Sequence, residues 1–169
     1  MPERTIELNV NGEGRTLRVE DRTTLADALR DGCQLTGTHL ACEHGVCGAC
    51  TVLLNGDAVR SCLLFAVQAV GSSVTTVEGL APDEGSLSVV QEAFREAHGL
   101  QCGFCTPGFV VSLTAFLANH PDPSDEDLRQ ALSGNLCRCT GYQGIVAAAR
   151  LAADRLGRDS ASVGADGRA

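Results

Sequence analysis

CEHGVCGAC, residues 42–50, places three cysteines in a stretch with no regular hydrophobic period. Another cysteine follows twelve positions later, so the full spacing is C-x4-C-x2-C-x11-C, formed by Cys42, Cys47, Cys50 and Cys62. The beginning of this spacing is the plant-type pattern of a two-iron, two-sulfur cluster. Structural zinc sites more often use two short cysteine pairs, and C-x4-C-x2-C fits that arrangement poorly. The stretch therefore predicts a [2Fe-2S] cluster held by these thiolates.

The composition favours metal over disulfides as the reason for so many cysteines. The chain has 169 residues, 44% of them hydrophobic, and nine cysteines, which suits one or two small domains with thin cores. Its start, MPERTIELNV, lacks the basic and apolar segments of a secretory signal, and no apolar stretch approaches the roughly 20 residues of a membrane span. We therefore expect a cytoplasmic protein, in which stable disulfides are rare. The net charge of −8 argues against a nucleic-acid surface.

The first half of the chain has the two-residue period of a small sheet. Alternating apolar residues flank Asn-Gly pairs at 11–12 and 55–56, and each pair predicts a hairpin turn. The stretch TTLADALRDG opens with a capping box and predicts a short helix, and SSVTTVEGL supplies one more strand. These elements predict an α+β domain over residues 1–78. Residues 79–85, rich in glycine and acidic side chains, are expected to be a linker.

The second half changes to the helical period of about 3.6 residues over positions 86–157. Four helix starts are expected, at Ser86, at Thr106 with Pro107 in the first turn, at Ser124 and near Thr140. Four short helices in this length predict a small bundle. Residues 158–169 are polar and rich in small side chains, and we expect a disordered tail there.

A second cysteine group, Cys102, Cys105, Cys137 and Cys139, lies in loops that lead into two of these helices. The stretches CGFCTPG and CRCTGYQG echo one another, because threonine follows each pair of cysteines. Helix N-termini carry unpaired N–H groups and partial positive charge, so two of them facing one site would favour an anionic cluster. This spacing alone leaves zinc open. Beside a ferredoxin-like half, a second [2Fe-2S] cluster explains the group better.

Three stretches, CEHGVCGACTVLLNGDAVRSC, QCGFCTPGFV and GNLCRCTGYQGI, resemble the small iron-sulfur subunit of the molybdenum hydroxylases, the xanthine oxidase and carbon monoxide dehydrogenase family. The resemblance covers roughly residues 4–157 and all eight cysteine positions named above. It implies a β-grasp, plant-type ferredoxin domain followed by a four-helix bundle that holds the second cluster. It also implies an oxidoreductase complex with a large molybdopterin subunit and a medium FAD subunit.

In such a complex this chain would pass electrons one at a time from the molybdenum-pterin centre, through its two clusters, to FAD on a partner subunit. The resemblance implies that the cluster of the helical domain lies next to the pterin. It also implies that Gln101, directly before Cys102, hydrogen-bonds the pterin. Family habit further implies the cytosine dinucleotide form of the pterin and a dimer of heterotrimers. The chain would have no substrate site of its own.

Two other functions compete with this interpretation: a free-standing two-cluster ferredoxin and a zinc-stabilised interaction module. Cys33 has no partner at ligand spacing, so we interpret it as a small buried hydrophobe. His44 lies inside the first cysteine loop, where four cysteines already complete the site. We find no residue grouping for hydrolysis or acid-base catalysis, and no G-x-G-x-x-G after a strand, so FAD is expected on another chain.

Overall fold

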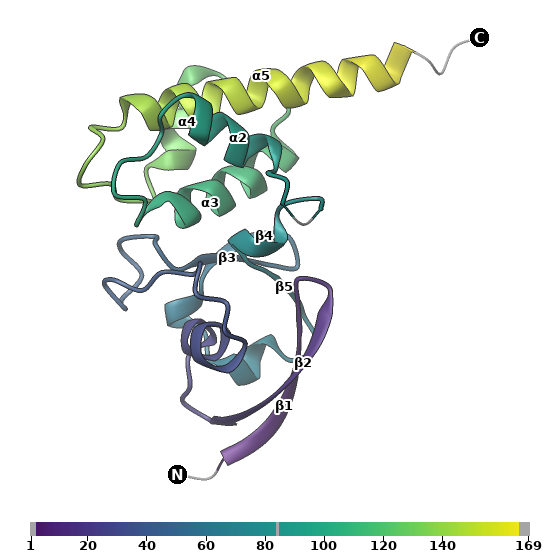
Figure 1. Ribbon diagram of the computed structural model, residues 1–169, viewed down its shortest axis with the longest axis vertical. Helices are drawn as coiled ribbons and strands as arrows, with labels where there is room; N and C mark the ends of the chain where they lie inside the picture. Colours follow the sequence, from purple (N-terminus) through teal and green to yellow (C-terminus); the bar gives the residue numbers. More distant parts are fainter. Residues whose placement is uncertain (1–2, 84, 166–169) are drawn as a thin grey trace.

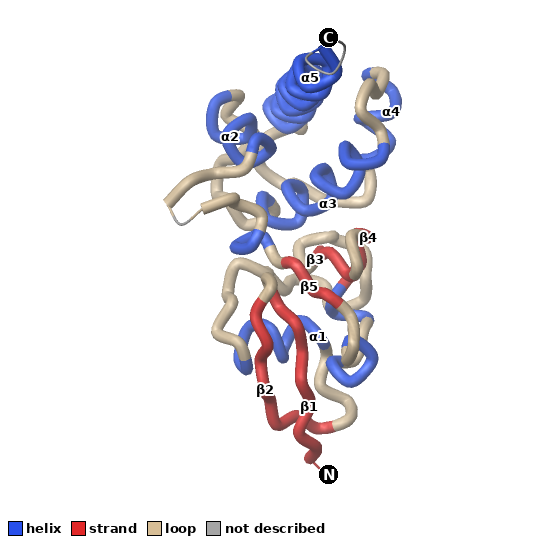
Figure 2. Tube along the Cα trace, turned by 90° about the vertical axis from the view of Figure 1, so that its right-hand side faces the viewer, coloured by secondary structure: helices blue, strands red, loops and turns tan. Residues whose placement is uncertain are grey.

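The structure is a computed structural model that describes residues 3–83 and 85–165. Figure 1 shows a half built on a sheet near the N-terminus and a helical half above it, with the C-terminal helix crossing the far end. Figure 2 shows from the side that the strands lie in one half and the long helices in the other. The predicted class, an α+β sheet domain followed by a four-helix domain, is confirmed.

A five-stranded mixed sheet forms the first half, residues 3–79, which we call the sheet half. The strands lie in the order β2-β1-β5-β3-β4, and β1 pairs with β5 in parallel while the other neighbours are antiparallel. Their bounds are Glu3–Val10 for β1, Glu13–Glu20 for β2, Thr51–Leu54 for β3, Asp57–Arg60 for β4 and Ser73–Thr75 for β5.

Both Asn-Gly pairs form the predicted two-residue hairpin turns. Asn11 has φ 53° and Gly12 has φ 82°, and Asn55 and Gly56 have φ 53° and 93°. Positive φ at both central residues gives the turn whose twist matches that of paired strands, and asparagine and glycine tolerate it best. The turns therefore fix the registers Val10 to Glu13 and Leu54 to Asp57.

A short helix covers one face of the sheet. It begins as α1 (Leu25–Asp27) and continues as a wider π-helical turn, η1 (Ala28–Gly32). The Thr24 hydroxyl accepts a hydrogen bond from the Asp27 amide at 3.1 Å, as the capping box predicted. Short 3-10 turns complete this half: η2 (Ser61–Leu63), η3 (Ala66–Ala69) and η4 (Val77–Gly79). The core between helix and sheet is formed mainly by Ile6, Leu8, Val10, Leu25, Leu29, Val52 and Val74.

Four helices form the second half, residues 88–165, which we call the helical half. They are α2 (Val89–Glu96), α3 (Thr106–Asn119), α4 (Asp125–Leu132) and α5 (Gln143–Ala165). Their apolar faces meet in one core, in which Phe94, Phe109, Leu113, Leu128 and Ile145 are almost completely buried. The capping box predicted at Ser124 is confirmed, since its hydroxyl accepts from the Asp127 amide at 3.2 Å.

Three predicted helix starts are wrong by a few residues. Ser88 caps α2 in a capping box with Gln91, whereas Ser86 bonds back to Asp83 in the preceding turn. Helix α3 has Cys105 at its N-cap, so Thr106 is already helical. Helix α5 starts at Gln143 because Gly141 and Tyr142 have positive φ, a conformation that a right-handed helix excludes.

The last helix continues beyond the predicted end of the helical domain. We expected residues 158–169 to be disordered, but α5 extends to Ala165, and residues 166–169 lie outside the described part of the chain. The stretch AAARLAADRL before Gly157 consists of strong helix formers, and a single glycine weakens a helix by only about 1 kcal/mol. Within residues 3–83 and 85–165, no helix is long and apolar enough to cross a membrane.

The two halves meet where α3 crosses the first cysteine loop and β3. A Cβ atom placed on Gly108 of α3 would lie 2.2 Å from the Gly48 carbonyl oxygen and 3.1 Å from the Ala49 Cα. Only hydrogen fits in that space. Arg60 at the end of β4 also donates a hydrogen bond to the Gly134 carbonyl of the helical half. The contact is therefore a tight packing of backbone against backbone.

We predict that Gly108→Ala lowers the free energy of unfolding by about 2 kcal/mol, because the methyl group forces helix and loop apart. The thermal midpoint, measured by circular dichroism, should fall by about 5 °C. Gly14→Ala is the matched control, since Gly14 lies on β2 with no atom within 4 Å of an added Cβ. Equal shifts in the two variants would contradict the close approach.

Candidate iron-sulfur sites

The first cysteine loop, residues 42–50, connects η1 to β3, and Cys62 comes from η2. Cys50 and Cys62 are buried and pack with Ala26. The Ser61 amide and hydroxyl both donate hydrogen bonds to the Cys50 carbonyl, at 3.3 and 2.7 Å. These bonds fasten the end of the loop to η2, so the Cys50 and Cys62 sulfurs lie within hydrogen-bonding distance of each other.

The other two sulfurs of this loop form a second pair. The Cys47 amide donates to the Cys42 sulfur at 3.4 Å. Backbone N–H groups of Cys47 and His44 lower the pKa of Cys42 to about 6, because they stabilise the thiolate. Burial raises the pKa of Cys62 to about 11, and its bond to Cys50 adds to this. At pH 7 the thiolate is therefore the favoured form of Cys42, whereas the pKa of Cys62 favours its thiol.

Two glycines in this loop have a left-handed backbone. Gly45 and Gly48 have φ 85° and 76°. A Cβ atom on Gly45 would lie 2.5 Å from a methyl carbon of Leu63, and one on Gly48 would lie 2.5 Å from the Asn135 side-chain nitrogen. Both positions therefore need glycine for two reasons, the left-handed conformation and the lack of space.

The second cysteine group also gathers at one place. The Cys102 and Cys139 sulfurs lie 3.6 Å apart and are exposed, whereas Cys105 and Cys137 are partly buried beside each other. Cys105 is the N-cap of α3, as expected for a helix N-terminus directed at the site. Cys105 directly precedes α3, whereas residues 140–142 separate Cys139 from the start of α5, so only one of the two loops leads straight into its helix.

Hydrogen bonds and burial shift the pKa values of the two partly buried sulfurs, those of Cys105 and Cys137, in opposite directions. Burial raises the pKa of Cys105 to about 12, and the neighbouring Cys137 sulfur adds to the shift. Burial acts the same way on Cys137, but hydrogen bonds from the Thr140 hydroxyl and amide outweigh it and lower the pKa of Cys137 to about 7. The Cys102 sulfur raises the pKa of Cys139.

The chemistry of the donor sets fits two-iron clusters. Each site presents four cysteine sulfurs arranged as two pairs, Cys42 with Cys47 and Cys50 with Cys62, then Cys102 with Cys139 and Cys105 with Cys137. Each iron of a [2Fe-2S] cluster takes two cysteine ligands, so pairs are the required arrangement. In the described residues, no three His, Cys, Asp or Glu side chains converge closely enough to hold a single metal ion.

A direct link joins the two cysteine loops. The Leu136 amide donates to the Cys47 carbonyl at 2.9 Å, which connects the neighbour of Cys137 to a residue of the first loop. The Asn135 side chain, 2% exposed, donates to the Gly48 carbonyl at 3.0 Å and accepts from the Ser112 hydroxyl at 2.9 Å. Sequence analysis missed Asn135, although an asparagine two residues before a predicted ligand cysteine was a signal for it.

Comparison with known proteins assigns both halves. Residues 8–74 match the 2Fe-2S iron-sulfur cluster binding domain family, and residues 76–150 match the [2Fe-2S] binding domain family. The chain is 56% identical over 152 residues to the nicotine 6-hydroxylase small subunit of Paenarthrobacter nicotinovorans, covering 90% of this chain and 91% of that protein. The chain belongs to the iron-sulfur subunits of the molybdenum hydroxylases.

Further relatives agree with this family. The caffeine dehydrogenase subunit gamma of Pseudomonas sp. strain CBB1 is 56% identical over 149 residues, covering 86% of this chain and 89% of that protein. Among solved structures, quinoline 2-oxidoreductase from Pseudomonas putida 86 superposes with a TM-score of 0.88 at 48% identity, covering 94% of this chain and 98% of that one. The chain is thus a subunit of an oxidoreductase, and its two domains are each of a [2Fe-2S]-binding type.

The halves of this iron-sulfur subunit are also joined by a histidine that sequence analysis missed. His39 Nδ1 lies 2.7 Å from the Phe104 carbonyl oxygen, and the two rings stack with centroids 4.8 Å apart. His39 precedes the first cysteine loop, and Phe104 lies between Cys102 and Cys105. No motif in the sequence indicates this pair, because the contact forms only when the two halves pack together.

Three other residues named from the sequence of this molybdenum hydroxylase subunit are Gln101, Cys33 and His44. Gln101 is exposed beside Cys102, and its role toward a pterin stays a prediction. Cys33 is buried in the core of the sheet half, and burial raises its pKa. His44 Nδ1 contacts the Cys42 carbonyl, so it lies against the loop backbone.

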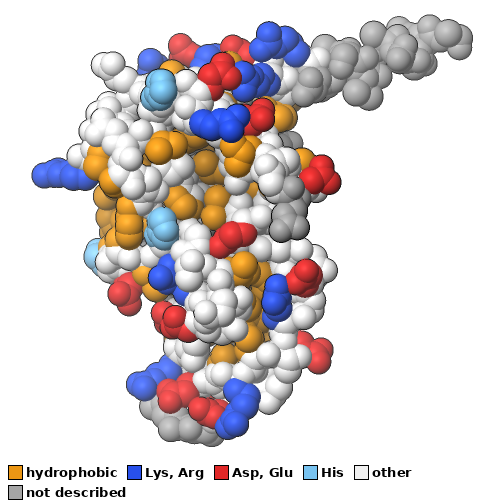
Figure 3. All heavy atoms as spheres, viewed as in Figure 1, with side chains coloured by type: hydrophobic (Ala, Val, Ile, Leu, Met, Phe, Trp, Pro, Cys, Tyr) orange, Lys and Arg blue, Asp and Glu red, His pale blue; other side chains and the backbone are white. Residues whose placement is uncertain are grey.

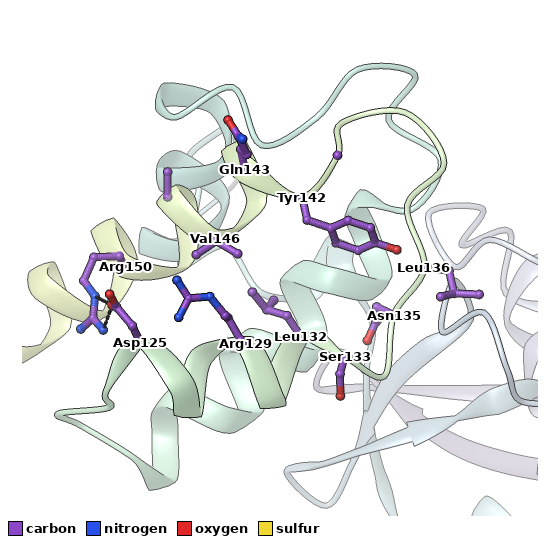
Figure 4. Close-up of a pocket in the computed structure, with 12 residues that line it drawn as sticks. Asp125, Arg129, Leu132, Ser133, Asn135, Leu136, Tyr142, Gln143, Val146 and Arg150 are labelled. Carbon is purple, nitrogen blue, oxygen red and sulfur yellow. Dashed lines mark hydrogen bonds and ion pairs between the residues drawn. The ribbon is translucent and has the colours of Figure 1, made fainter.

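A cavity of about 680 Å³ lies between α4 and α5 of this subunit (Figure 4). Leu132 and Val146 contribute apolar lining, and Arg150 crosses to form an ion pair with Asp125. None of the described residues that line it is a cysteine or a histidine. Its lining includes Ser133 and Tyr142, and through Leu136, the neighbour of Cys137, the cavity borders the second cysteine group.

Apolar side chains on the surface gather around the two cysteine groups. Figure 3 shows hydrophobic side chains exposed on one face, both over the helical half and between the halves. Val46 and Leu63 are 58% and 61% exposed next to the first loop, and Phe104 and Leu136 are 45% and 51% exposed next to the second group. Exposed apolar residues grouped in this way mark surfaces that other chains cover.

We predict that Asn135→Ala lowers the free energy of unfolding by about 2 kcal/mol, because it removes one donor from the buried Gly48 carbonyl and the acceptor of the Ser112 hydroxyl. The temperature at which the visible absorption of the clusters is lost should fall by about 5 °C. The matched control is Asn119→Ala, since Asn119 is exposed at the end of α3 and bonds only within its own helix. A similar loss in the control would refute a special role for Asn135.

We predict that the cysteines of the cluster-free chain differ strongly in reactivity toward iodoacetamide at pH 7. A pKa of about 6 leaves Cys42 about nine-tenths ionised, whereas a pKa of about 11 leaves Cys62 about one part in ten thousand ionised. Raising the pH to 8 should hardly change the Cys42 rate but should increase the Cys62 rate about tenfold. Peptide mass spectrometry gives both rates, with circular dichroism to verify folding and the urea-unfolded chain as control. Equal rates in the folded chain would contradict the assignment.

Proposed function

We propose that this chain carries electrons from a molybdenum-pterin centre on a large partner subunit, through two [2Fe-2S] clusters, to FAD on a medium partner subunit. When bound, each cluster supplies a site that takes up and gives up a single electron. The chain's own residues hold the clusters, fix their separation and exclude water from the inner sulfurs. Substrate chemistry takes place on the large subunit.

The observation that carries this proposal is the hydrogen bond from the Leu136 amide to the Cys47 carbonyl. Because Leu136 is bonded covalently to Cys137, this hydrogen bond provides a short route of bonded atoms between the two cysteine groups. Electron tunnelling falls off steeply with distance and is favoured by bonded contacts over gaps. The Gly48–Gly108 contact and Asn135 keep this route rigid. A free-standing ferredoxin would have little use for a second domain of this kind.

Each site is proposed to hold its cluster through four thiolates. In the domain of residues 1–78 these are Cys42, Cys47, Cys50 and Cys62, and in the domain of residues 86–157 they are Cys102, Cys105, Cys137 and Cys139, with residues 79–85 as the linker between the domains. The inward N–H bond to Cys42 and the position of Cys105 at the start of α3 support the assignment, because both stabilise negative charge.

The helical half is proposed to face the molybdenum subunit. Its outer sulfurs, Cys102 and Cys139, are exposed, and the apolar side chains of Phe104 and Leu136 beside them need a cover. Gln101 projects from the same loop and is proposed to hydrogen-bond the pterin. The sheet half, with Val46 and Leu63 exposed at its own site, would then face the flavin.

The complex is proposed to be a cytoplasmic dimer of heterotrimers that uses the cytosine dinucleotide form of molybdopterin. The relatives named for nicotine, caffeine and nicotinate are 56%, 56% and 49% identical to this chain. These names support a nitrogen heterocycle as the class of substrate. The substrate pocket itself belongs to the large subunit.

The test is low-temperature EPR of the dithionite-reduced, natively purified protein, with iron, sulfide and molybdenum measured on the same sample. We expect two distinct signals, about four irons per chain and molybdenum in equal amount to the chain. Two signals without molybdenum or partner chains would favour the free-standing ferredoxin instead. A single signal with zinc in place of two irons would indicate that the helical half is a zinc module.

We predict that Cys102→Ser abolishes only the EPR signal of the helical half and that Cys42→Ser abolishes only that of the sheet half, because serine is a much poorer ligand for iron in these clusters. Cys33→Ala is the matched control and should keep both signals, since Cys33 lies in the hydrophobic core. Loss of a signal in the control, or retention of both in either serine variant, would refute the ligand assignment.

A further inference from the structure

Among the hydroxyl groups of the described residues in the helical half, that of Thr140 lies closest to a cysteine sulfur. Its hydroxyl oxygen lies 3.2 Å from the Cys137 sulfur, and its backbone amide donates to the same sulfur at 3.4 Å. The Tyr142 amide donates to the Thr140 hydroxyl oxygen at 3.1 Å. The three residues therefore form a chain of hydrogen bonds that ends at Cys137.

The direction of the bond between Thr140 and Cys137 follows from proton counting. A sulfur that ligates iron carries no proton, so it can only accept. The Thr140 hydroxyl has one proton and two lone pairs, and the Tyr142 amide occupies one lone pair. The hydroxyl must then donate its proton to the Cys137 sulfur.

The loop geometry holds this arrangement in place. Tyr142 has φ 67°, which turns the chain before α5 starts, and its phenol oxygen accepts from the Cys137 amide at 3.0 Å. Figure 4 shows the ring of Tyr142 directed from the start of α5 back toward the loop that contains Leu136. Thr140 and Cys137 are both partly buried, so water competes only weakly for the sulfur.

The sequence echo between the two cysteine loops does not predict this contact. Thr106 follows Cys105 as Thr140 follows Cys139, but the buried Thr106 hydroxyl has no hydrogen-bond partner in the described residues. The difference arises because Thr106 is already in the first turn of α3, whereas Thr140 lies in a loop that folds back over Cys137.

We infer that the Thr140 hydroxyl donates a hydrogen bond to the Cys137 ligand and thereby raises the reduction potential of the helical-half cluster. Reduction adds one negative charge, which is shared by the ligand sulfurs. A donor to sulfur stabilises the more negative state, because hydrogen bonds to charged acceptors are stronger. Thr140 is therefore a tuning residue, and the inference rests on the proposed function, since it requires a cluster at this site.

The test compares Thr140→Val with Thr140→Ser in the natively purified holoprotein, by redox titration monitored by EPR. Valine keeps the shape but removes the hydroxyl. At a fixed solution potential, the ratio of oxidised to reduced helical-half cluster should rise about tenfold in the valine variant. For a one-electron couple this is a shift of about 59 mV to more negative potential. Serine keeps the hydroxyl and should restore the wild-type midpoint, and the signal of the sheet half should not move.

Thr114→Val is the matched control, because Thr114 lies in α3 and donates only to the Val110 carbonyl of its own helix, at 2.8 Å. An unchanged midpoint in Thr140→Val, or an equal shift of both signals, would overturn the inference. If Thr140→Val fails to hold the cluster, Thr140→Ala is titrated in its place. Cluster loss in both, with retention in Thr140→Ser, would also overturn the inference, because the hydroxyl would then serve assembly.

The outcome also separates this inference from the proposed function. Absence of two EPR signals from the wild-type protein would refute the proposed function and leave nothing for Thr140 to tune. Two signals in the wild type with an unshifted midpoint in the valine variant would refute the role of Thr140 alone.

Discussion

The Gly48 carbonyl is the point on which the arrangement of the two halves depends. It accepts hydrogen bonds from the Thr51 amide and hydroxyl, at 3.2 and 2.6 Å, and from the Asn135 side chain at 3.0 Å. It also lies so close to Gly108 of α3 that no side chain fits between them. This carbonyl oxygen thus lies near the end of the first cysteine loop, bonds to the first residue of β3 and contacts the helical half. The helical half makes both the Asn135 bond and the close contact of Gly108, and together these hold the halves in one relative position.

The two cysteine groups differ in how their sulfurs are stabilised. In the sheet half, backbone N–H groups of the loop act on Cys42, while Cys50 and Cys62 are buried against Ala26. In the helical half, Cys105 occupies the N-cap position of α3 and Cys137 receives two bonds from Thr140. Reduction potentials of iron-sulfur clusters respond to hydrogen bonds on sulfur and to exposure, so two sites of the same composition can have different potentials.

These differences agree with the role proposed for the chain, which is to pass electrons between redox centres of partner subunits. The outer sulfurs of the helical half are exposed together with Phe104 and Leu136, and the sheet half exposes Val46 and Leu63 at its own site. Between the two cysteine groups, the Leu136 amide donates a hydrogen bond to the Cys47 carbonyl where the halves pack together. The cavity between α4 and α5 borders this line of contacts, because Asn135 and Leu136 contribute to its lining.

Local features could be predicted from the sequence: the Asn-Gly turns, the Ser124 capping box, both cysteine groups and the order of the two domains, because turns, caps and cysteine spacings are short patterns in the chain. Sequence analysis misplaced the starts of α2 and α5, because Ser88 caps α2 in place of Ser86 and the positive φ of Tyr142 delays the start of α5. The pairing of the cysteines within each group and the residues that join the halves follow only from the packing of the folded chain. Asn135 and Thr140 act through contacts that form only on packing, and hydrogen bonds of that kind leave no periodic pattern in a sequence.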